Sequence, residues 1–258
     1  PAILTMSIAA WEAYKKVSAA PRHIAPWHKG LPSAPLLGRL AGVRPYASYA
    51  AGLSLGEYSA LVAAEALSLE EGVFLVRKRG EYMEEEALKK PGKMLSIIGL
   101  DRAAVSSICQ QTQTEIANIN CPGQIVISGL VANIEKAEKL AKESSARMAL
   151  ILEVSGAFHS SLMKGAALRL AEELEKIKFK APRIPVVCNV TAKPVRSAAE
   201  IKDNLVKQVV SSVLWEDSMK FMLSKGVKNF IELGPGSVLK GLMRRIDNQA
   251  QVINIEKK

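Results

Sequence analysis

The sequence is 258 residues long, 48% of them apolar, and carries a formal net charge of +10 at pH 7. This length and apolar content predict a folded protein with a sizeable core, and no run of 18 apolar residues indicates a membrane span. The 35 Lys and Arg residues are spread through predicted helices rather than gathered with aromatic residues, which argues against a nucleic-acid-binding protein and favours anionic partners. The three cysteines have no Cys-x-x-Cys spacing, so we expect a reducing compartment and neither disulfides, a metal nor another cofactor.

The first 46 residues divide into a predicted helix and a predicted loop. Apolar residues recur at helical spacing over residues 2–17, whereas residues 19–46 hold five prolines and predict a long loop. His23 and His28 in this loop have no neighbours that would complete a site, and we interpret them as solvated. Because the chain begins inside the predicted helix and without a methionine, we expect that an N-terminal segment and any targeting peptide have been removed.

The next stretch, Gly52-Leu53-Ser54-Leu55-Gly56, has the Gly-x-Ser-x-Gly spacing of a sharp turn from a strand into a helix. The two glycines are expected to remove side chains that would clash there, which leaves the Ser54 hydroxyl exposed. The Leu55 amide begins a predicted helix over residues 57–66, where it would stabilise negative charge on a bound carbonyl oxygen. A buried small turn explains the same five residues, so the pattern alone leaves both interpretations open.

A helix is predicted over residues 69–86, with Val76 and Met83 inward and the charged residues 77–79 and 84–86 mostly outward. The pattern then changes to the order β-α-β-β-α-β, which is typical of a ferredoxin-like unit. Its expected elements are a strand over 94–100, a helix over 102–111, strands over 115–120 and 124–129, a helix over 134–143 and a strand over 148–153.

Beyond this unit, helices and strands alternate again, which predicts a parallel sheet. The expected elements are a helix over 161–177, a strand over 186–190, a helix over 201–209, a strand over 229–233 and a helix over 237–246. The predicted fold class is therefore α/β. Residues 1–92 and 154–258 would form the main domain, and residues 93–153 an inserted ferredoxin-like subdomain.

His159 is the candidate base for Ser54. A serine hydroxyl needs a base to act as a nucleophile, and of the three histidines only His159 stands at an element boundary. It follows Ser54 by 105 residues, so only the fold can bring the two together. A capping or core histidine is the alternative reading.

Six separated motifs resemble, in order and spacing, those of malonyl-CoA:acyl carrier protein transacylases, over a match from Ala50 to Ile255. They are Gly52-Leu-Ser-Leu-Gly-Glu-Tyr-Ser-Ala-Leu61, Arg79-Gly-Glu-Tyr-Met83, Cys121-Pro-Gly-Gln124, Gly156-Ala-Phe-His159 with Leu162-Met163, Pro185-Val-Val-Cys-Asn189 and Glu232-Leu-Gly-Pro-Gly236.

The resemblance implies a role for each matching residue. Ser54 would take the malonyl group as an ester, with His159 as the base and the backbone carbonyl of Gln208 orienting that histidine in place of an aspartate. Arg79 would hold the free malonyl carboxylate with its bidentate fork, although by itself it reads as part of a solvated helix face.

Two further residues of the matching motifs would shape the acyl site. The Leu55 amide would be one oxyanion donor, and Phe158 would exclude substituents at the acyl α-carbon. The partners implied are malonyl-CoA and acyl carrier protein, with the enzyme a monomer.

The chain departs from the family at three places. Leu53 stands where many members have histidine. Plastid-like and cyanobacterial-like members share the leucine, so the resemblance implies the plastid stroma, with a bacterial-type cytoplasm or a mitochondrion as alternatives. The family's first strand and Gly-Gln-Gly-x-Gln loop, with a second oxyanion donor, would be missing from the serine-hydrolase-like main domain; losing one such donor costs about 10²–10³ in rate. The loop over 19–46 is longer than the family's connection.

The leading hypothesis is malonyl transfer to acyl carrier protein in fatty-acid synthesis. A serine esterase of the α/β-hydrolase kind is one alternative, although that family orders its triad Ser, acid, His and has no need of Arg79. An inactive truncated form without the N-terminal oxyanion loop is the other.

Overall fold

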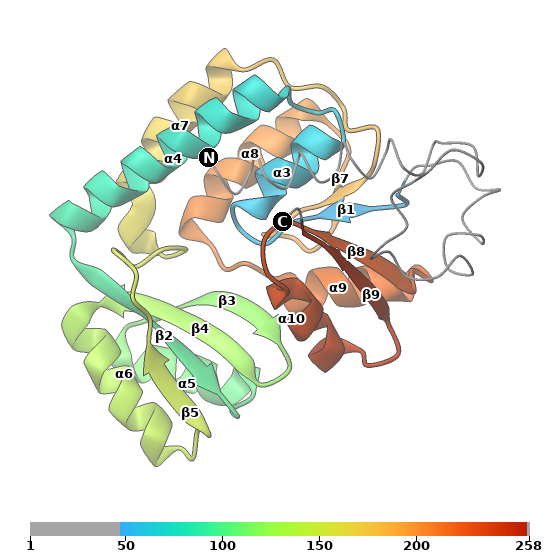
Figure 1. Cartoon of the computed structure of the whole chain (residues 1–258). Coiled ribbons are helices and arrows are strands. Elements are labelled where there is room, and N and C mark those ends of the chain that lie inside the picture. The colour runs from blue at the N-terminus through green and yellow to red at the C-terminus, as the bar shows by residue number, and fades with distance from the viewer. Residues whose placement is uncertain (1–46, 257–258) are drawn as a thin grey trace.

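The computed structural model describes residues 47–256, which form the two parts seen in Figure 1. One part is a four-stranded sheet with its helices, and the other holds the remaining strands and a group of long helices. The predictions for residues 2–17 and 19–46, with His23 and His28, fall outside the described residues. Within residues 47–256 every helix is too short or too polar to cross a bilayer.

The larger part begins and ends the described chain. Its strands are β1 (Ala50–Ala51), β6 (Val186–Val187), β7 (Pro194–Val195), β8 (Asn229–Leu233) and β9 (Gln251–Ile255). Its helices are α3 (Gly56–Ala63), α4 (Leu69–Lys89), the 3₁₀ turn η1 (Ser161–Met163), α7 (Lys164–Lys176), α8 (Ala198–Val210), α9 (Trp215–Ser224) and α10 (Val238–Ile246).

The larger part contains two parallel strand pairs, as the alternation of elements predicts, and they belong to separate sheets. The pair β1–β6 adjoins the serine-bearing turn. β1 pairs in parallel with β6, and β8 pairs in parallel with β9, whereas β6 and β7 are antiparallel. Helix α4 starts at a capping box, in which Ser68 and Glu71 satisfy each other's backbone amides. Its buried face packs with α3, α7 and α8 into one core around fully buried Tyr58, Leu75 and Leu170.

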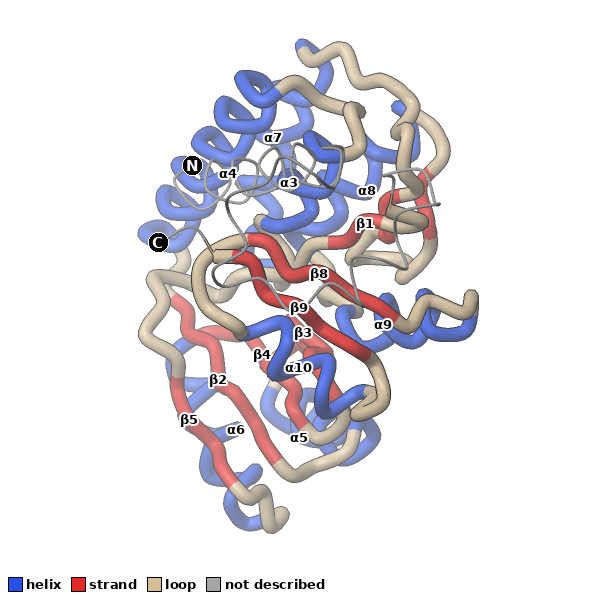
Figure 2. Tube along the Cα trace, turned by 45° about the vertical axis from the view of Figure 1, so that its right-hand side comes forward, coloured by secondary structure: helices blue, strands red, loops and turns tan. Residues whose placement is uncertain are grey.

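The smaller part has the predicted β-α-β-β-α-β succession. Its elements are β2 (Gly92–Ile98), α5 (Arg102–Thr112), β3 (Glu115–Cys121), β4 (Gln124–Leu130), α6 (Val131–Glu143) and β5 (Met148–Ile151). The strands lie in the order β3-β4-β2-β5, all neighbours antiparallel, and both helices cover one face (Figures 1 and 2). Leu95, Ile127 and Ile134 are fully buried between helices and sheet.

The chain between α8 and α9 joins the two parts. Val213 runs parallel to β3 as an isolated bridge partner of Asn118. Its backbone amide donates to the Ala117 carbonyl at 2.8 Å, and its carbonyl accepts from the Ile119 amide at 2.9 Å. A residue of the larger part therefore pairs with the edge of the small sheet, along β3.

Several elements differ from the predictions. The strand expected over 186–190 is only Val186–Val187, because the chain turns at Ala192, whose φ is 53°, and the Cys188 amide bonds the Lys193 carbonyl to close a hairpin with β7. Helix α9 and strands β7 and β9 were not predicted. The predicted helix over 161–177 begins as the 3₁₀ turn η1 and continues as α7.

Candidate active site

The turn from β1 into α3 places Ser54 in a strained backbone conformation. Its φ is 50°, in the left-handed region that non-glycine residues rarely adopt. A Cβ on Gly52 would lie 2.0 Å from the backbone carbonyl of Gly56, so only glycine fits there. A Cβ on Gly56 would have no described atom within 4 Å. The expectation that both glycines relieve a clash is therefore wrong for Gly56.

Ser54, His159 and the backbone carbonyl of Gln208 form a chain of two hydrogen bonds. Ser54 Oγ is 2.8 Å from His159 Nε2, and His159 Nδ1 is 2.7 Å from the backbone carbonyl of Gln208. Because a carbonyl only accepts, Nδ1 carries the imidazole proton, and the Nε2 lone pair faces the serine hydroxyl. Burial, and next the positive charge of Arg79, lower the pKa of His159 to about 4, so the ring is neutral at pH 7.

Arg79 is buried beside the serine rather than solvated. It is 7% exposed, and its Nη2 donates to Ser54 Oγ at 2.9 Å and to Gln208 Oε1 at 3.3 Å. Its Nε is buried and has no hydrogen-bond partner among the described residues. The outward position expected for residues 77–79 is wrong for Arg79, and that for 84–86 is wrong for Glu86, which is 6% exposed. Arg79 therefore keeps one buried N–H donor that the described residues do not use.

Two buried residues without a predicted role, Asn189 and Glu57, hold the turn in place. Asn189 Oδ1 accepts from the Ser54 amide at 2.6 Å, and Asn189 Nδ2 donates to the Gly52 carbonyl at 2.8 Å. Glu57 Oε2 accepts from the Asn189 amide at 3.1 Å and from Gln208 Nε2 at 2.6 Å. Both residues stand inside motifs that the sequence analysis singles out, but their partners lie more than 130 residues away.

The two remaining predicted residues also lie at this site. Leu55 is the N-cap residue of α3, and no described acceptor takes its amide proton, which leaves that N–H available beside Ser54. Phe158 is half-buried next to His159. A cavity of about 390 Å³ opens here, and its lining includes Ser54, Arg79, Gly80, Met83, Phe158 and His159.

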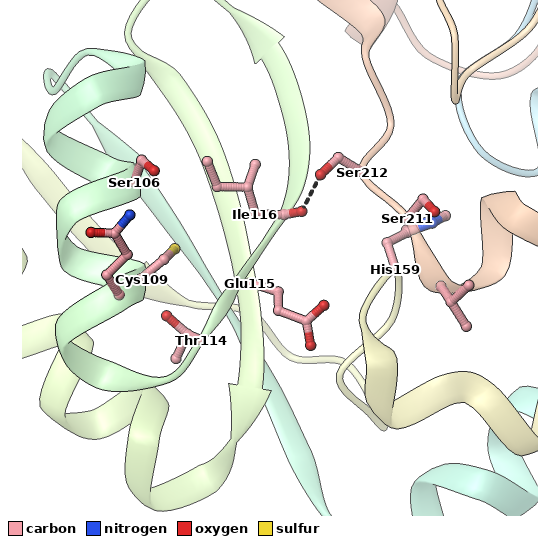
Figure 3. Close-up of a pocket in the computed structure, with 10 residues that line it drawn as sticks. Ser106, Cys109, Thr114, Glu115, Ile116, His159, Ser211 and Ser212 are labelled. Carbon is pink, nitrogen blue, oxygen red and sulfur yellow. Dashed lines mark hydrogen bonds between the residues drawn. The ribbon is translucent and has the colours of Figure 1, made fainter.

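A second cavity, of about 490 Å³, also borders His159 and lies between the two parts of the molecule (Figure 3). Ser106 lines it from α5, Glu115 from β3 and Thr114 from the chain between them, and Ser211 and Ser212 line it from the chain after α8. His159 thus borders both cavities.

The arrangement supports nucleophilic chemistry at a carbonyl carbon. Ser54 has a neutral base, an available amide for a developing oxyanion, and a buried guanidinium that suits a carboxylate. A backbone carbonyl takes the place of the usual acidic third member of a triad. Among the described residues, no group of His, Cys, Asp or Glu could hold a metal, and the three cysteines are buried and free.

Comparisons with known proteins agree with this chemistry. The profile of the acyl transferase domain family matches residues 34–256. The malonyl CoA-acyl carrier protein transacylase of Bacillus subtilis (strain 168) is 41% identical over 260 residues, which is 99% of this chain and 74% of that protein. The protein of the same name from Salmonella typhimurium (strain LT2) is 40% identical over 95% of this chain and 73% of its own length.

Solved structures are also similar over nearly the whole chain. The acyl carrier protein S-malonyltransferase of Vibrio cholerae superposes with a TM-score of 0.87 at 34% identity, covering 100% of this chain and 78% of that one. A malonyl-transacylase in complex with its type II PKS acyl-carrier protein gives a TM-score of 0.85 at 35% identity, covering 99% and 76% of the two chains.

Proposed function

This chain belongs to the acyl transferase domain family, and we propose that it transfers malonyl groups from malonyl-CoA to the phosphopantetheine thiol of acyl carrier protein, in fatty-acid biosynthesis. Its similarity to malonyl CoA-acyl carrier protein transacylases over nearly its whole length supports this function. The observation that carries it is the position of Arg79, whose Nη2 lies 2.9 Å from Ser54 Oγ. A buried guanidinium next to a nucleophile suits an acyl group that ends in a carboxylate.

In the first half-reaction Ser54 takes the acyl group. His159 Nε2 accepts the hydroxyl proton while Ser54 Oγ attacks the thioester carbonyl, and the Leu55 amide stabilises the resulting oxyanion. The carbon–sulfur bond then breaks, and the departing thiolate of coenzyme A takes the proton from His159. The product is a malonyl ester on Ser54.

In the second half-reaction the phosphopantetheine thiol gives its proton to His159 Nε2. Its sulfur attacks the ester carbonyl, the bond to Ser54 Oγ breaks, and His159 returns the proton to the serine. The two carriers therefore use one site in turn, and the Gln208 carbonyl keeps the imidazole tautomer that both steps need.

Two side chains select the acyl group in this proposal. Arg79 holds the free carboxylate through its fork, for which the unpartnered Nε provides a second donor. Phe158 crowds the acyl α-carbon from the wall of the cavity. Malonyl would thereby be preferred both to acetyl, which lacks the carboxylate, and to α-branched acyl groups.

We also propose a monomer that works in the plastid stroma. The support for this compartment is the resemblance at Leu53 to plastid-like and cyanobacterial-like members. Light scattering of the purified chain gives its mass in solution, and organelle fractionation with an antibody to the chain gives its compartment. A dimeric mass, or recovery with mitochondria, would contradict the respective proposal.

Labelled malonyl-CoA tests the function directly. We expect a covalent malonyl adduct that peptide mass spectrometry maps to Ser54, that is absent in Ser54→Ala, and that acyl carrier protein discharges faster than water does. Rapid hydrolysis without transfer would favour a serine esterase instead. An adduct on another residue would remove Ser54 from the proposal while leaving the transfer reaction intact.

A further inference from the structure

The chain around His159 needs outside support to hold the imidazole in place. The φ of His159 is 58°, in the left-handed region, a strained conformation that a non-glycine residue keeps only where its surroundings fix it. His159 lies in the irregular chain between β5 and η1, outside any helix or strand. The contacts on either side of it therefore decide where its ring lies.

The small four-stranded sheet supplies a contact immediately before the histidine. Ser128, in β4, is fully buried, and its Oγ donates to the Phe158 carbonyl at 2.5 Å. That carbonyl belongs to the peptide group that leads into His159. A buried hydroxyl bonded to this peptide limits its rotation, and hence the φ of the next residue.

The same sheet supplies a second contact just after the histidine. Glu115, in β3, accepts from the Ser161 amide at 3.0 Å and 3.1 Å through its two carboxylate oxygens, and from Ser161 Oγ at 2.5 Å. Ser161 is the first residue of η1, so the carboxylate also caps a helix start. Figure 3 shows the Glu115 carboxylate pointing from β3 toward the chain that carries His159.

Strand β3 also holds the segment that orients the other ring nitrogen. Ser212 Oγ donates to the Ile116 carbonyl, the bond drawn in Figure 3, and Val213 pairs with Asn118. Gln208, whose carbonyl bonds His159 Nδ1, lies near the end of α8 just before this segment. One strand thus fixes both the chain that carries the imidazole and the chain that carries its acceptor.

We propose that Ser128 and Glu115 are positioning residues for the proposed base His159, so that the small sheet sets the direction of its imidazole toward Ser54. The expected effect on the acylation rate rests on the proposed function, whereas the expected effect on the position of the His159 ring does not. Ser128 Oγ acts through the Phe158 peptide. Glu115 acts through Ser161, although it also lines the larger cavity, so the test separates positioning from substrate contact.

The variants are Ser128→Ala and Glu115→Ala, each with a matched control. Ser96→Ala removes a buried hydroxyl from the neighbouring strand β2, and Glu135→Ala removes an exposed carboxylate from α6. Within residues 47–256 neither side chain hydrogen-bonds to the chain around His159. Glu115→Gln is the conservative variant, because its amide oxygen still accepts from the Ser161 amide.

Single-turnover acylation by labelled malonyl-CoA is measured well below each variant's unfolding temperature. We expect both alanine variants to acylate about 10- to 30-fold more slowly at saturating malonyl-CoA, as losing a hydrogen bond of about 1.5–2 kcal/mol would give, with unchanged KM. Glu115→Gln should retain most of the rate, and both controls all of it. Unchanged rates with only a lower unfolding temperature would overturn the proposal, as would a raised KM without a lower rate for Glu115→Ala.

A spectroscopic readout stands apart from the reaction. The His159 Nδ1–H donated to Gln208 gives a low-field proton NMR signal, which His159→Asn identifies among the three histidines. We expect this signal to shift or broaden in Ser128→Ala and Glu115→Ala and to stay in place in the controls. If neither the parent nor any variant transfers malonyl, the proposed function fails. The positioning role is tested separately, and an NMR signal that stays in place in both alanine variants would refute it.

Discussion

The carboxylate of Glu57 and the side-chain amide of Gln208 form a buried 2.6 Å hydrogen bond directly behind the serine and histidine. Glu57 belongs to the helix that follows Ser54, and Gln208 carries the carbonyl that bonds His159, so this pair ties the two halves of the site together. Burial raises the pKa of Glu57 to about 7, against the opposing effects of the bonds from Gln208 and Asn189 and the charge of Arg79. The protein therefore buries a carboxyl and an imidazole whose pKa values are shifted in opposite directions, upward for Glu57 and downward for His159.

The stability of Glu57→Gln relative to the parent should increase as pH rises. The folded pKa of about 7 lies above the ordinary 4.5, so Glu57 contributes stability that is complete below pH 4.5 and is lost as pH rises to 7. Relative to the parent, the variant should gain about 3 kcal/mol over that interval. Urea unfolding at a series of pH values measures this difference.

His159→Asn should show the opposite pH dependence. Asparagine is chosen because it tolerates the positive φ of this position. The folded pKa of about 4 lies below the ordinary 6.5, so His159 contributes stability that is present above pH 6.5 and lost as pH falls to 4. Relative to the parent, this variant should gain about 3 kcal/mol as pH falls through that interval. Parallel pH curves for parent and both variants would contradict both assignments.

The two glycines of the serine turn should respond differently to alanine. In Gly52→Ala the new Cβ would lie 2.0 Å from backbone atoms of Gly56, so we expect severe destabilisation or loss of folding. In Gly56→Ala the Cβ meets no described atom within 4 Å, and alanine is the better helix former by about 0.5–1 kcal/mol. Circular dichroism and acylation of Ser54 measure both variants. An inactive, unfolded Gly56→Ala would show that the motif needs both glycines after all.

Much of the fold follows from local pattern. Strands β2, β3 and β4 alternate or run apolar between turn residues, and Pro122-Gly123 marks the hairpin, so the small sheet could be predicted from sequence. Helix α9 also has a local signal, since Trp215, Met219 and Met222 recur at helical spacing and are buried. Strand β9 is short, and its partner β8 lies 22 residues away, so no local turn indicates their pairing.

The buried position of Arg79 was also readable from periodicity. It lies four residues after Leu75 and four before Met83, on the stripe that faces the core, whereas its charge and its neighbours Arg77 and Lys78 suggest solvent. Glu57 and Asn189 could not be found this way. Their roles consist of hydrogen bonds between segments 132 residues apart, which only the folded chain brings together.

Phe158→Ala should relax the choice of acyl group. The ring lines the acyl cavity, and its removal makes room for a methyl group at the α-carbon. We expect the ratio of methylmalonyl to malonyl transfer to rise about tenfold or more, within the range that one carbon atom supports. Parallel assays of the two thioesters measure the ratio. Phe74→Ala, which removes an exposed ring from α4, is the control and should leave it unchanged.

Arg79→Ala separates a carboxylate-selecting transferase from a general acyltransferase. In the free protein the guanidinium bonds Ser54 and Gln208 through Nη2 and leaves Nε unpartnered among the described residues. The proposed bidentate grip on a malonyl carboxylate would comprise two charge-assisted bonds. Losing both should cost roughly 1.5–3 kcal/mol per bond, which corresponds to a fall of about 10²–10⁴-fold in malonyl transfer. Parallel assays of malonyl and acetyl transfer from coenzyme A measure this.

Acetyl transfer by Arg79→Ala should survive, because acetyl has no carboxylate for the guanidinium to hold. Arg79→Lys should restore malonyl transfer only in part, since an ammonium supplies charge without the planar fork. Arg77→Ala is the matched control, because that exposed arginine of the same helix pairs with Glu81 on the surface. Equal loss of both acyl groups in Arg79→Ala would mean that Arg79 serves the serine turn rather than the substrate, and the preference for malonyl would then need another source.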